Sequence, residues 1–191
     1  METLSKNRRE SLIRLLKDPD ESVRKSAADA LEKLEGKANL EALIEIYSHG
    51  DKKTRLQAIY ALAKISDSAA SETLVNALSG EDEDIRSAAV RVLGQRRDRS
   101  AIAPLIERLD DPSMTIRTLA IEALGNFEDK RLTPTMIEVL KSPNKYLLIS
   151  AIEALGRLRS QEAEPALMQL LSHAEPEVRR AAAAALGELE L

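Results

Sequence analysis

The sequence repeats itself with a period of 31 residues, and this periodicity constrains the fold more than any other feature. Shifting the chain by 31 residues brings leucine into one column and alanine into another in all six copies. The two columns are Leu31, Leu62, Leu93, Leu124, Leu155 and Leu186, and Ala27, Ala58, Ala89, Ala120, Ala151 and Ala182. Repeats of this length indicate small structural units that stack on one another and share a continuous core.

Each copy carries two runs of apolar residues at helical spacing. In the first copy, Leu12 and Leu16 lie four residues apart, which places them on one face of a helix. Asp18 and Pro19 then form a capping residue followed by proline, a pattern typical of the start of a second helix. Glycines fall near the ends of the expected second helices, where we expect them to let the chain turn back. They are Gly94, Gly125, Gly156 and Gly187.

A pair of helices of this size cannot bury its apolar stripe alone, so neighbouring pairs must stack. We therefore predict an all-α fold, an α-solenoid that forms a right-handed superhelix of six 31-residue helix pairs. The whole chain, 1–191, would form a single repeat domain. The expected repeats are about 5–35, 36–66, 67–97, 98–128, 129–159 and 160–190.

The composition fits a folded protein and narrows the classes of partner. With 43% hydrophobic and 31% charged residues, the chain can bury a substantial core. The net charge of -4 and the pI of about 5.4 argue against bulk affinity for nucleic acid or for an anionic membrane. The chain has no cysteine for a disulfide or a zinc site, and no apolar run is long enough to span a bilayer. We expect a soluble protein of the cytoplasm.

The pattern shared by the copies, D-P-x-x-x-V-R-x-x-A-x-x-A-L-G, resembles the HEAT repeat over nearly the whole chain. The likeness is to the short variety found in phycobilisome-lyase-like proteins. The resemblance implies that the first helix of each pair lies on the convex side and that the second lines the concave side. It also implies a polar ladder between successive repeats, which we expect to stabilise the stack rather than to bind a partner. Its members here would be Asp18, Arg24, Arg55, Arg86, Asp111, Arg117 and Arg179, with Leu148 breaking the ladder in the fifth repeat.

A helical wheel at about 100° per residue indicates which side chains of the second helices face away from the core. Tyr60 with Leu56, and Tyr146 with Ile149, form apolar pairs on a face that should be polar if only water covered it. One interpretation is that the tyrosines anchor a partner, and the other is that they pack on neighbouring repeats. The candidate partner-binding residues of the concave face are Leu56, Tyr60, Arg91, Thr118, Glu122, Tyr146, Ile149 and Glu153.

Arginines gather near the end of the third copy. Arg96 stands in a column that is apolar in the other copies. Its neighbours in the sequence include Arg86, Arg91, Arg97 and Arg99. The cluster could bind a phosphate or an acidic peptide, or it could be solvated and paired with nearby acidic residues.

The sequence offers little for catalysis. The histidines His49 and His173 lie four repeats apart without a metal-ligand spacing, so we expect no metal and no cofactor. Deoxyhypusine hydroxylase resembles this chain in architecture, but its His-Glu pairs are replaced here by His-Gly and His-Ala. HEAT-like DNA glycosylases have basic grooves with aromatic residues, which this acidic chain without tryptophan does not match.

These observations predict a protein-interaction scaffold whose concave face holds an extended or helical segment of another protein or peptide. The alternative is an enzyme or enzyme subunit of the bilin lyase-isomerase type, which the character of the repeats suggests and which would bind a small-molecule chromophore. A further alternative is a structural spacer, favoured if the groove is fully polar and solvated.

Overall fold

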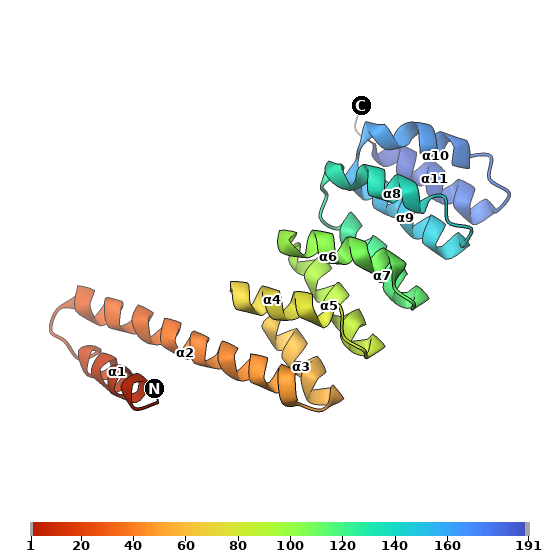
Figure 1. Cartoon of the computed structure of the whole chain (residues 1–191). Coiled ribbons are helices and arrows are strands. Elements are labelled where there is room, and N and C mark those ends of the chain that lie inside the picture. The colour runs from red at the N-terminus through yellow and green to blue at the C-terminus, as the bar shows by residue number, and fades with distance from the viewer. Residues whose placement is uncertain (1, 190–191) are drawn as a thin grey trace.

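The computed structural model consists of α-helices joined by tight turns and short 3-10 helices (Figure 1). It describes residues 2–189, without the side chains of residues 2–6, 9 and 32, and that range contains no strand. The α-helices are α1 (Glu2–Leu15), α2 (Glu21–His49), α3 (Lys52–Leu62), α4 (Ser68–Ala77), α5 (Glu83–Arg96), α6 (Ile102–Glu107), α7 (Met114–Gly125), α8 (Thr133–Val139), α9 (Lys145–Leu158), α10 (Glu164–Leu170) and α11 (Pro176–Glu188). The 3-10 helices are η1 (Arg99–Ala101), η2 (Arg108–Asp110), η3 (Lys130–Leu132) and η4 (Gln161–Ala163).

From α3 onward the helices form two layers (Figure 1). Helices α4, α6, α8 and α10 form the first-helix layer, and α3, α5, α7, α9 and α11 form the second-helix layer. Each helix of the second-helix layer packs against the next one, and each first helix packs against the second helix of its own pair. The predicted α-solenoid is therefore confirmed, and the two termini lie at opposite ends of it.

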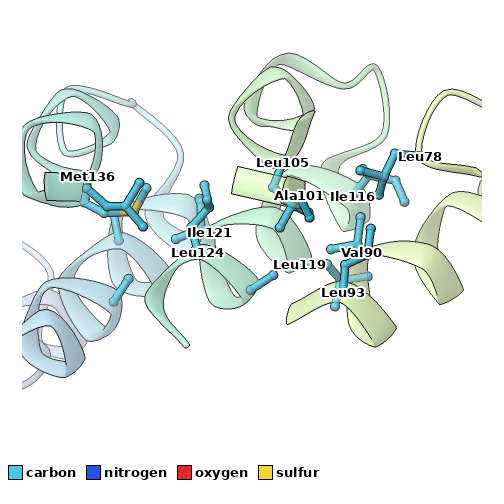
Figure 2. Packing of buried hydrophobic residues seen from close by; sticks show 14 of the residues in the cluster. Leu78, Val90, Leu93, Ala101, Leu105, Ile116, Leu119, Ile121, Leu124 and Met136 are labelled. Atoms are coloured by element: carbon cyan, nitrogen blue, oxygen red, sulfur yellow. The ribbon is translucent and has the colours of Figure 1, made fainter. Parts of the chain in front are cut away.

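The repeated apolar columns supply the core between the two layers. Leu62 and Leu93, from the invariant leucine column, are fully buried, and so are Leu105 and Met136 from the first helices. Figure 2 shows Leu105 and Met136 lying between the layers. From Leu40 onward the buried residues of successive repeats form one cluster, so each of these repeats extends the same core.

The turns that follow α5, α7 and α9 each contain a residue in the left-handed region. Arg97, Glu128 and Arg159 lie in these turns with φ values of 53°, 53° and 50°. This conformation redirects the chain, although glycine is its usual occupant. Asp98 and Asp129 come directly afterwards, and each carboxylate accepts a hydrogen bond at 3.1 Å from the backbone N–H two residues ahead. The first turn of the next helical segment is thereby capped.

The glycines near the ends of the second helices do not turn the chain, so that expectation was wrong. Gly94, Gly125 and Gly156 belong to their helices, and none has a positive φ. A Cβ atom at Gly94 would lie 2.6 Å from the Cβ of Ala123, and one at Gly156 would lie 3.3 Å from the Cβ of Ala185. These glycines therefore allow neighbouring second helices to approach each other closely.

The N-terminal part departs from the predicted repeat. Helix α2 continues through Gly36, so the expected second helix of the first repeat and first helix of the second repeat are one helix of 29 residues. In Figure 1, α1 lies along the first half of α2, and α3 meets its other end. The hairpin formed by α1 and residues 21–35 projects from the solenoid instead of stacking on it.

The sequence explains why the chain does not turn at the end of the first repeat. In the positions equivalent to Gly36, later repeats have Asp98 and Asp129, whose carboxylates cap the next helical segment. Glycine has no side chain that could accept such a capping hydrogen bond. The position equivalent to Gly94 holds a glutamate, Glu32, and that residue type is too large for the close contact that glycine makes. Without a cap or a stacking contact, the uninterrupted helix keeps more of its backbone hydrogen bonds.

Replacing Gly94 by alanine tests the close contact between second helices. The added Cβ would lie 2.6 Å from that of Ala123, so Gly94→Ala should lower the free energy of unfolding by about 1–3 kcal/mol. Gly187→Ala is the matched control, because Gly187 stands in the same column and nothing lies within 4 Å of its added Cβ. The control should be neutral or stabilise the fold by up to about 1 kcal/mol, since alanine favours helix. Urea unfolding measures both, and equal effects would contradict the contact.

The cap at Asp129 makes stability depend on pH. The Arg131 side chain hydrogen-bonds the Asp129 carboxylate, with Nη2 2.6 Å from Oδ2, and together with its backbone N–H it lowers the pKa of Asp129 to about 2. Because this folded-state pKa is below the ordinary value of about 3.9, the carboxylate stabilises the fold above about pH 4 and loses this effect as the pH falls toward 2. Asp129→Ala should cost about 1 kcal/mol at pH 7 and less at low pH. Thermal unfolding followed by circular dichroism tests this, and a difference that does not change with pH would contradict it.

Candidate partner-binding surface

The second-helix layer is hollowed between α9 and α11, where a groove of about 800 Å³ opens to solvent. We call it the C-terminal groove. Ile149 and Glu153 contribute from α9, and Arg180 and Ala184 contribute from α11. The full lining is Glu128, Lys130, Ile149, Glu153, Gly156, Arg157, Leu158, Arg159, Glu177, Arg180, Ala181, Ala184, Ala185 and Glu188.

The lining of the C-terminal groove combines small apolar residues with charges of both signs. Gly156 on α9 and Ala181 and Ala184 on α11 leave space between the helices. The charged members are four glutamates, three arginines and one lysine. The exposed pair of Arg159 and Glu188 has Nη2 3.8 Å from Oε2. A bound segment would therefore meet apolar surface and either sign of charge within one groove.

An ion pair links the first turns of α9 and α11. The Nζ of Lys145 lies 3.5 Å from Oε1 of Glu177 and 3.8 Å from Oε2 of Glu175. The charges of Glu177 and Glu175 raise the pKa of Lys145. The pKa of Glu177 is lowered by a hydrogen bond from its own backbone N–H and by Lys145. Lys145 and Glu177 are therefore charged at neutral pH, and Glu177 enters the groove lining as a carboxylate.

Two of the predicted partner-binding residues, Ile149 and Glu153, line the C-terminal groove. Tyr146 lies at the start of the same helix and is 67% exposed, with the Nζ of Lys145 5.8 Å from its ring centroid. Tyr60 lies on α3 and is 53% exposed. Both tyrosines are thus open to solvent rather than packed into neighbouring repeats.

The remaining predicted residues lie outside the groove on α3, α5 and α7. Leu56 is half-buried and packs against the core. The hydroxyl of Thr118 donates a hydrogen bond to the carbonyl of Met114 at 3.0 Å, which is a local helix contact. Arg91 is exposed and Glu122 is half-buried. The structure therefore spreads the predicted set along the layer and does not gather it in one pocket.

The groove residues at the helix ends were not predicted from the sequence. Arg157, Arg159 and Glu188 lie in or just after the last turns of α9 and α11, outside the regular rows of the helical wheel. A Cβ at Gly125 would lie 3.0 Å from Nε of Arg157, so the absent side chain makes room for the arginine. The recurring glycines Gly94, Gly125 and Gly156 could have indicated these residues, because they mark where adjacent repeats come closest.

The arginine that recurs in the repeat pattern bonds mainly to the loop of its own repeat. In four repeats the arginine Nη1 donates to the backbone carbonyls five and six residues earlier, at 2.5–3.3 Å. These residues are Arg24, Arg86, Arg117 and Arg179. The guanidinium of Arg55 instead lies over the ring of Tyr47, 5.1 Å from its centroid.

Among the expected ladder residues, Arg86 also bonds the next repeat. Its Nε and Nη2 donate to the Asp111 carboxylate at 3.0 and 3.1 Å, and the two residues are 9% and 3% exposed. The same carboxylate accepts the backbone N–H of Ser113 at 2.9 Å. The column of Asp111 holds aspartate in one other repeat, at Asp18, and Leu148 replaces the arginine in the fifth repeat. The inter-repeat bond is therefore one buried pair and not a continuous ladder.

The arginines at the end of α5 are engaged by neighbouring parts of the chain. Arg96 donates to the carbonyl of Leu62 and to the hydroxyl of Ser71, both at 3.0 Å. Arg97 donates to Glu128 at 2.6 Å. Each of these arginines joins its helix to an adjacent repeat, so they do not form one free cationic patch.

The two histidines also have local partners. The Nδ1 of His49 lies 3.1 Å from Oε1 of Glu45, and the Nδ1 of His173 accepts the backbone N–H of Glu175 at 3.1 Å. Among the side chains that the structure describes, no three His, Asp or Glu residues are grouped to hold a metal ion. Within residues 2–189, no helix has both the length and the apolar character needed to cross a lipid bilayer.

Comparison with known proteins identifies the repeat. A family model of HEAT repeats matches residues 9–79, 40–125, 71–142 and 133–191. The chain belongs to the HEAT-repeat family. A comparison with curated proteins gives no match.

Several solved structures resemble this HEAT-repeat chain. A chain of the CpcE–CpcF complex of phycocyanin lyase from Nostoc is 28% identical with a TM-score of 0.66, and the match covers 78% of this chain and 64% of that one. This chain therefore spans less than two thirds of that lyase chain. A designed armadillo repeat protein in complex with the peptide (KR)4 is 22% identical with a TM-score of 0.61, covering 94% and 98% of the two chains. YibA of Escherichia coli is 22% identical with a TM-score of 0.61, covering 96% and 73%, and these last two matches show the fold alone.

Removing Arg86 should destabilise the HEAT-repeat stack. Arg86→Ala removes two charged hydrogen bonds from the buried carboxylate of Asp111 and leaves it with Arg108, whose Nη1 lies 3.9 Å from Oδ2, so the loss should be about 3 kcal/mol. Arg97→Ala is the control, because its ion pair with Glu128 is exposed and should be worth less than about 1 kcal/mol. Urea unfolding of both variants measures the difference. Losses of similar size would show that the buried pair does not hold the repeats together.

Proposed function

We propose that this HEAT-repeat protein is a scaffold that holds a segment of another protein against its second-helix layer. The observation that carries the proposal is the C-terminal groove, with its volume of about 800 Å³ and its mixed lining. A groove of this size accommodates several side chains of an extended or helical segment. The small residues of α11 supply apolar contact area, and the surrounding charges supply orientation.

The charge balance of the groove indicates the character of the segment. Four acidic and four basic side chains line it, so a peptide carrying both signs around an apolar residue would be complementary. The designed armadillo repeat protein with the same fold is in complex with the wholly basic peptide (KR)4. The groove of this chain carries equal numbers of acidic and basic side chains, so we expect it to prefer a mixed sequence to a wholly basic one.

The proposed surface extends along the layer from the groove. Tyr146 and Tyr60 present exposed aromatic rings, a residue type that often dominates interface energies. Arg91 and Glu122 lie on α5 and α7, the helices between those of the two tyrosines. In the proposed complex the tyrosines anchor the segment, and Arg91, Glu122 and Glu153 set its direction and charge preference.

A change in the groove should weaken binding of a peptide selected against the wild-type protein from a displayed random library. Ile149→Glu places a charge on an apolar part of the lining, and the loss should be about 2 kcal/mol or more, roughly 30-fold in Kd. Tyr146→Ala should weaken binding by a similar factor if the ring is an anchor. Isothermal titration calorimetry gives the Kd values, and circular dichroism shows whether the variants keep their helices.

Met168→Glu is the matched control for this experiment. Met168 is 53% exposed on α10, in the first-helix layer, so the charge should leave the Kd unchanged. Selected peptides that lose affinity for Met168→Glu but not for Ile149→Glu would place binding on the first-helix layer. The proposal would then fail although the fold is unchanged.

A second candidate function is a role as a bilin lyase-type enzyme or enzyme subunit. It is favoured by the 28% identity to a chain of a phycocyanin lyase complex. Mixing the purified protein with a bilin tests it, because binding in an ordered site changes the absorbance spectrum of the chromophore. An unchanged spectrum would remove this candidate. If no library peptide bound either, a structural spacer would be the remaining function.

A further inference from the structure

The charged side chains that line the C-terminal groove divide into those that the chain engages itself and those that it leaves open. Three of the four glutamates have a cationic partner within the chain, at N–O distances of 2.6, 3.5 and 3.8 Å. These pairs are Glu128 with Arg97, Glu177 with Lys145, and Glu188 with Arg159. Lys130 also interacts within the chain. Most of the negative charge of the lining is therefore already compensated.

Three charged residues of the lining remain. Among the side chains that the structure describes, no hydrogen bond or ion pair involves Glu153, Arg157 or Arg180, and all three are exposed. The charge of Arg180 helps to lower the pKa of Glu177, but it does so less than the backbone hydrogen bond of Glu177 and the charge of Lys145. The groove thus offers a partner two positive charges and one negative charge, instead of the even balance of its whole lining.

The packing of α9 on α11 determines where these charges lie along the groove. Near the starts of the two helices, Nζ of Lys145 lies 3.5 Å from Oε1 of Glu177. Near their ends, a Cβ at Gly156 would lie 3.2 Å from Cα of Ala185. The helices therefore run in the same direction. Arg180, one turn after Glu177, lies level with the second turn of α9.

The charges alternate in sign along the groove. Glu153 belongs to the third turn of α9 and Arg157 to the fourth, so the order after Arg180 is negative and then positive. At a rise of about 1.5 Å per residue, neighbouring charges are spaced by roughly 5–6 Å along the helix axis. Arg157 does not turn back toward Glu153, because its side chain lies against the preceding repeat, with Nε 3.0 Å from a Cβ built at Gly125.

The groove has a charged rim and an apolar floor. The three open charges are exposed, whereas Gly156 and Ala185 are buried between the helices and Ala181 is half-buried. An extended segment matches this cross-section, because its side chains alternate between two sides and every second one is about 6.6 Å from the last. A helix about 10 Å across would need about nine residues to present three charges at this spacing, which occupies roughly 1100 Å³. This volume exceeds the groove of about 800 Å³.

Building on the proposed function, we propose that the part of the partner segment in the C-terminal groove is an extended strand with acidic, basic and acidic residues at alternate positions. The two acidic side chains meet Arg180 and Arg157, and the basic side chain meets Glu153. The residues between them are small or apolar and lie on the floor of the groove. Because the pattern is symmetric, it holds for either direction of the segment.

Sequencing the peptides selected against the wild-type protein tests the pattern. Peptides that lose affinity for Ile149→Glu occupy the groove, and among them the alternating acidic, basic and acidic order should be roughly tenfold enriched over the unselected library. Groove-binding peptides without this order, or with the three charges four residues apart as on a helix, would overturn the inference while the proposed function stands. If no selected peptide depends on the groove, the proposed function fails and the inference falls with it.

A charge reversal tests the contact between Arg157 and an acidic residue of the segment. Arg157→Glu should weaken binding of a selected peptide by roughly tenfold in Kd. Replacing one of the two acidic residues of the peptide with lysine, and not the other, should restore the Kd to within about threefold.

Arg8→Glu is the matched control, because Arg8 is an exposed arginine on α1, at the other end of the solenoid (Figure 1). It makes the same change in net charge and should alter the Kd by less than about twofold at physiological salt. Isothermal titration calorimetry measures all the Kd values. Equal losses for Arg157→Glu and Arg8→Glu would overturn the inference, and so would a loss that neither lysine peptide restores.

Discussion

The close approach of successive second helices is the contact on which the rest of the solenoid depends. At Gly94, Gly125 and Gly156 the missing side chains let α5, α7 and α9 meet the alanines of the following helix. Dispersion contacts and burial both require this proximity, since a small gap already loses much of the attraction. The leucine columns can then join into one core that runs through the repeats. In the first two copies the column of these glycines holds Glu32 and Ala63. The first copy is also the one whose hairpin projects from the stack (Figure 1).

The same spacing accounts for the two surfaces that the molecule presents. Near the C-terminus, Gly156 and the alanines of α11 bring two helices close while leaving a shallow groove between charged helix ends. Near the N-terminus, the hairpin leaves the stack and the face carrying Ala61 stays uncovered within the chain. One surface thus results from close stacking, and the other results from its interruption.

The period of 31 residues was enough to predict stacked helix pairs and their buried columns, and the resemblance to HEAT repeats implied that first and second helices lie on different sides. It was not enough to predict α2, because Ala27 and Leu31 keep the repeat pattern in the first copy while the cap at position 36 is missing. A shared pattern indicates which residues can pack, but the end of a helix depends on a single capping residue. The ladder was overestimated for a similar reason, since Arg86 finds a carboxylate in the next repeat at Asp111 and most repeats lack one there. The groove residues at helix ends depend on turn geometry, which periodicity does not describe.

The central functional claim is that a partner segment binds the second-helix layer at the C-terminal groove. Hydrogen exchange measured by mass spectrometry, with and without a selected peptide, tests it most directly because the backbone of both layers is observed together. Exchange should slow in α9 and α11 and in the turn containing Glu128 and Lys130, with α4, α6, α8 and α10 unchanged. Protection confined to the first-helix layer would contradict it.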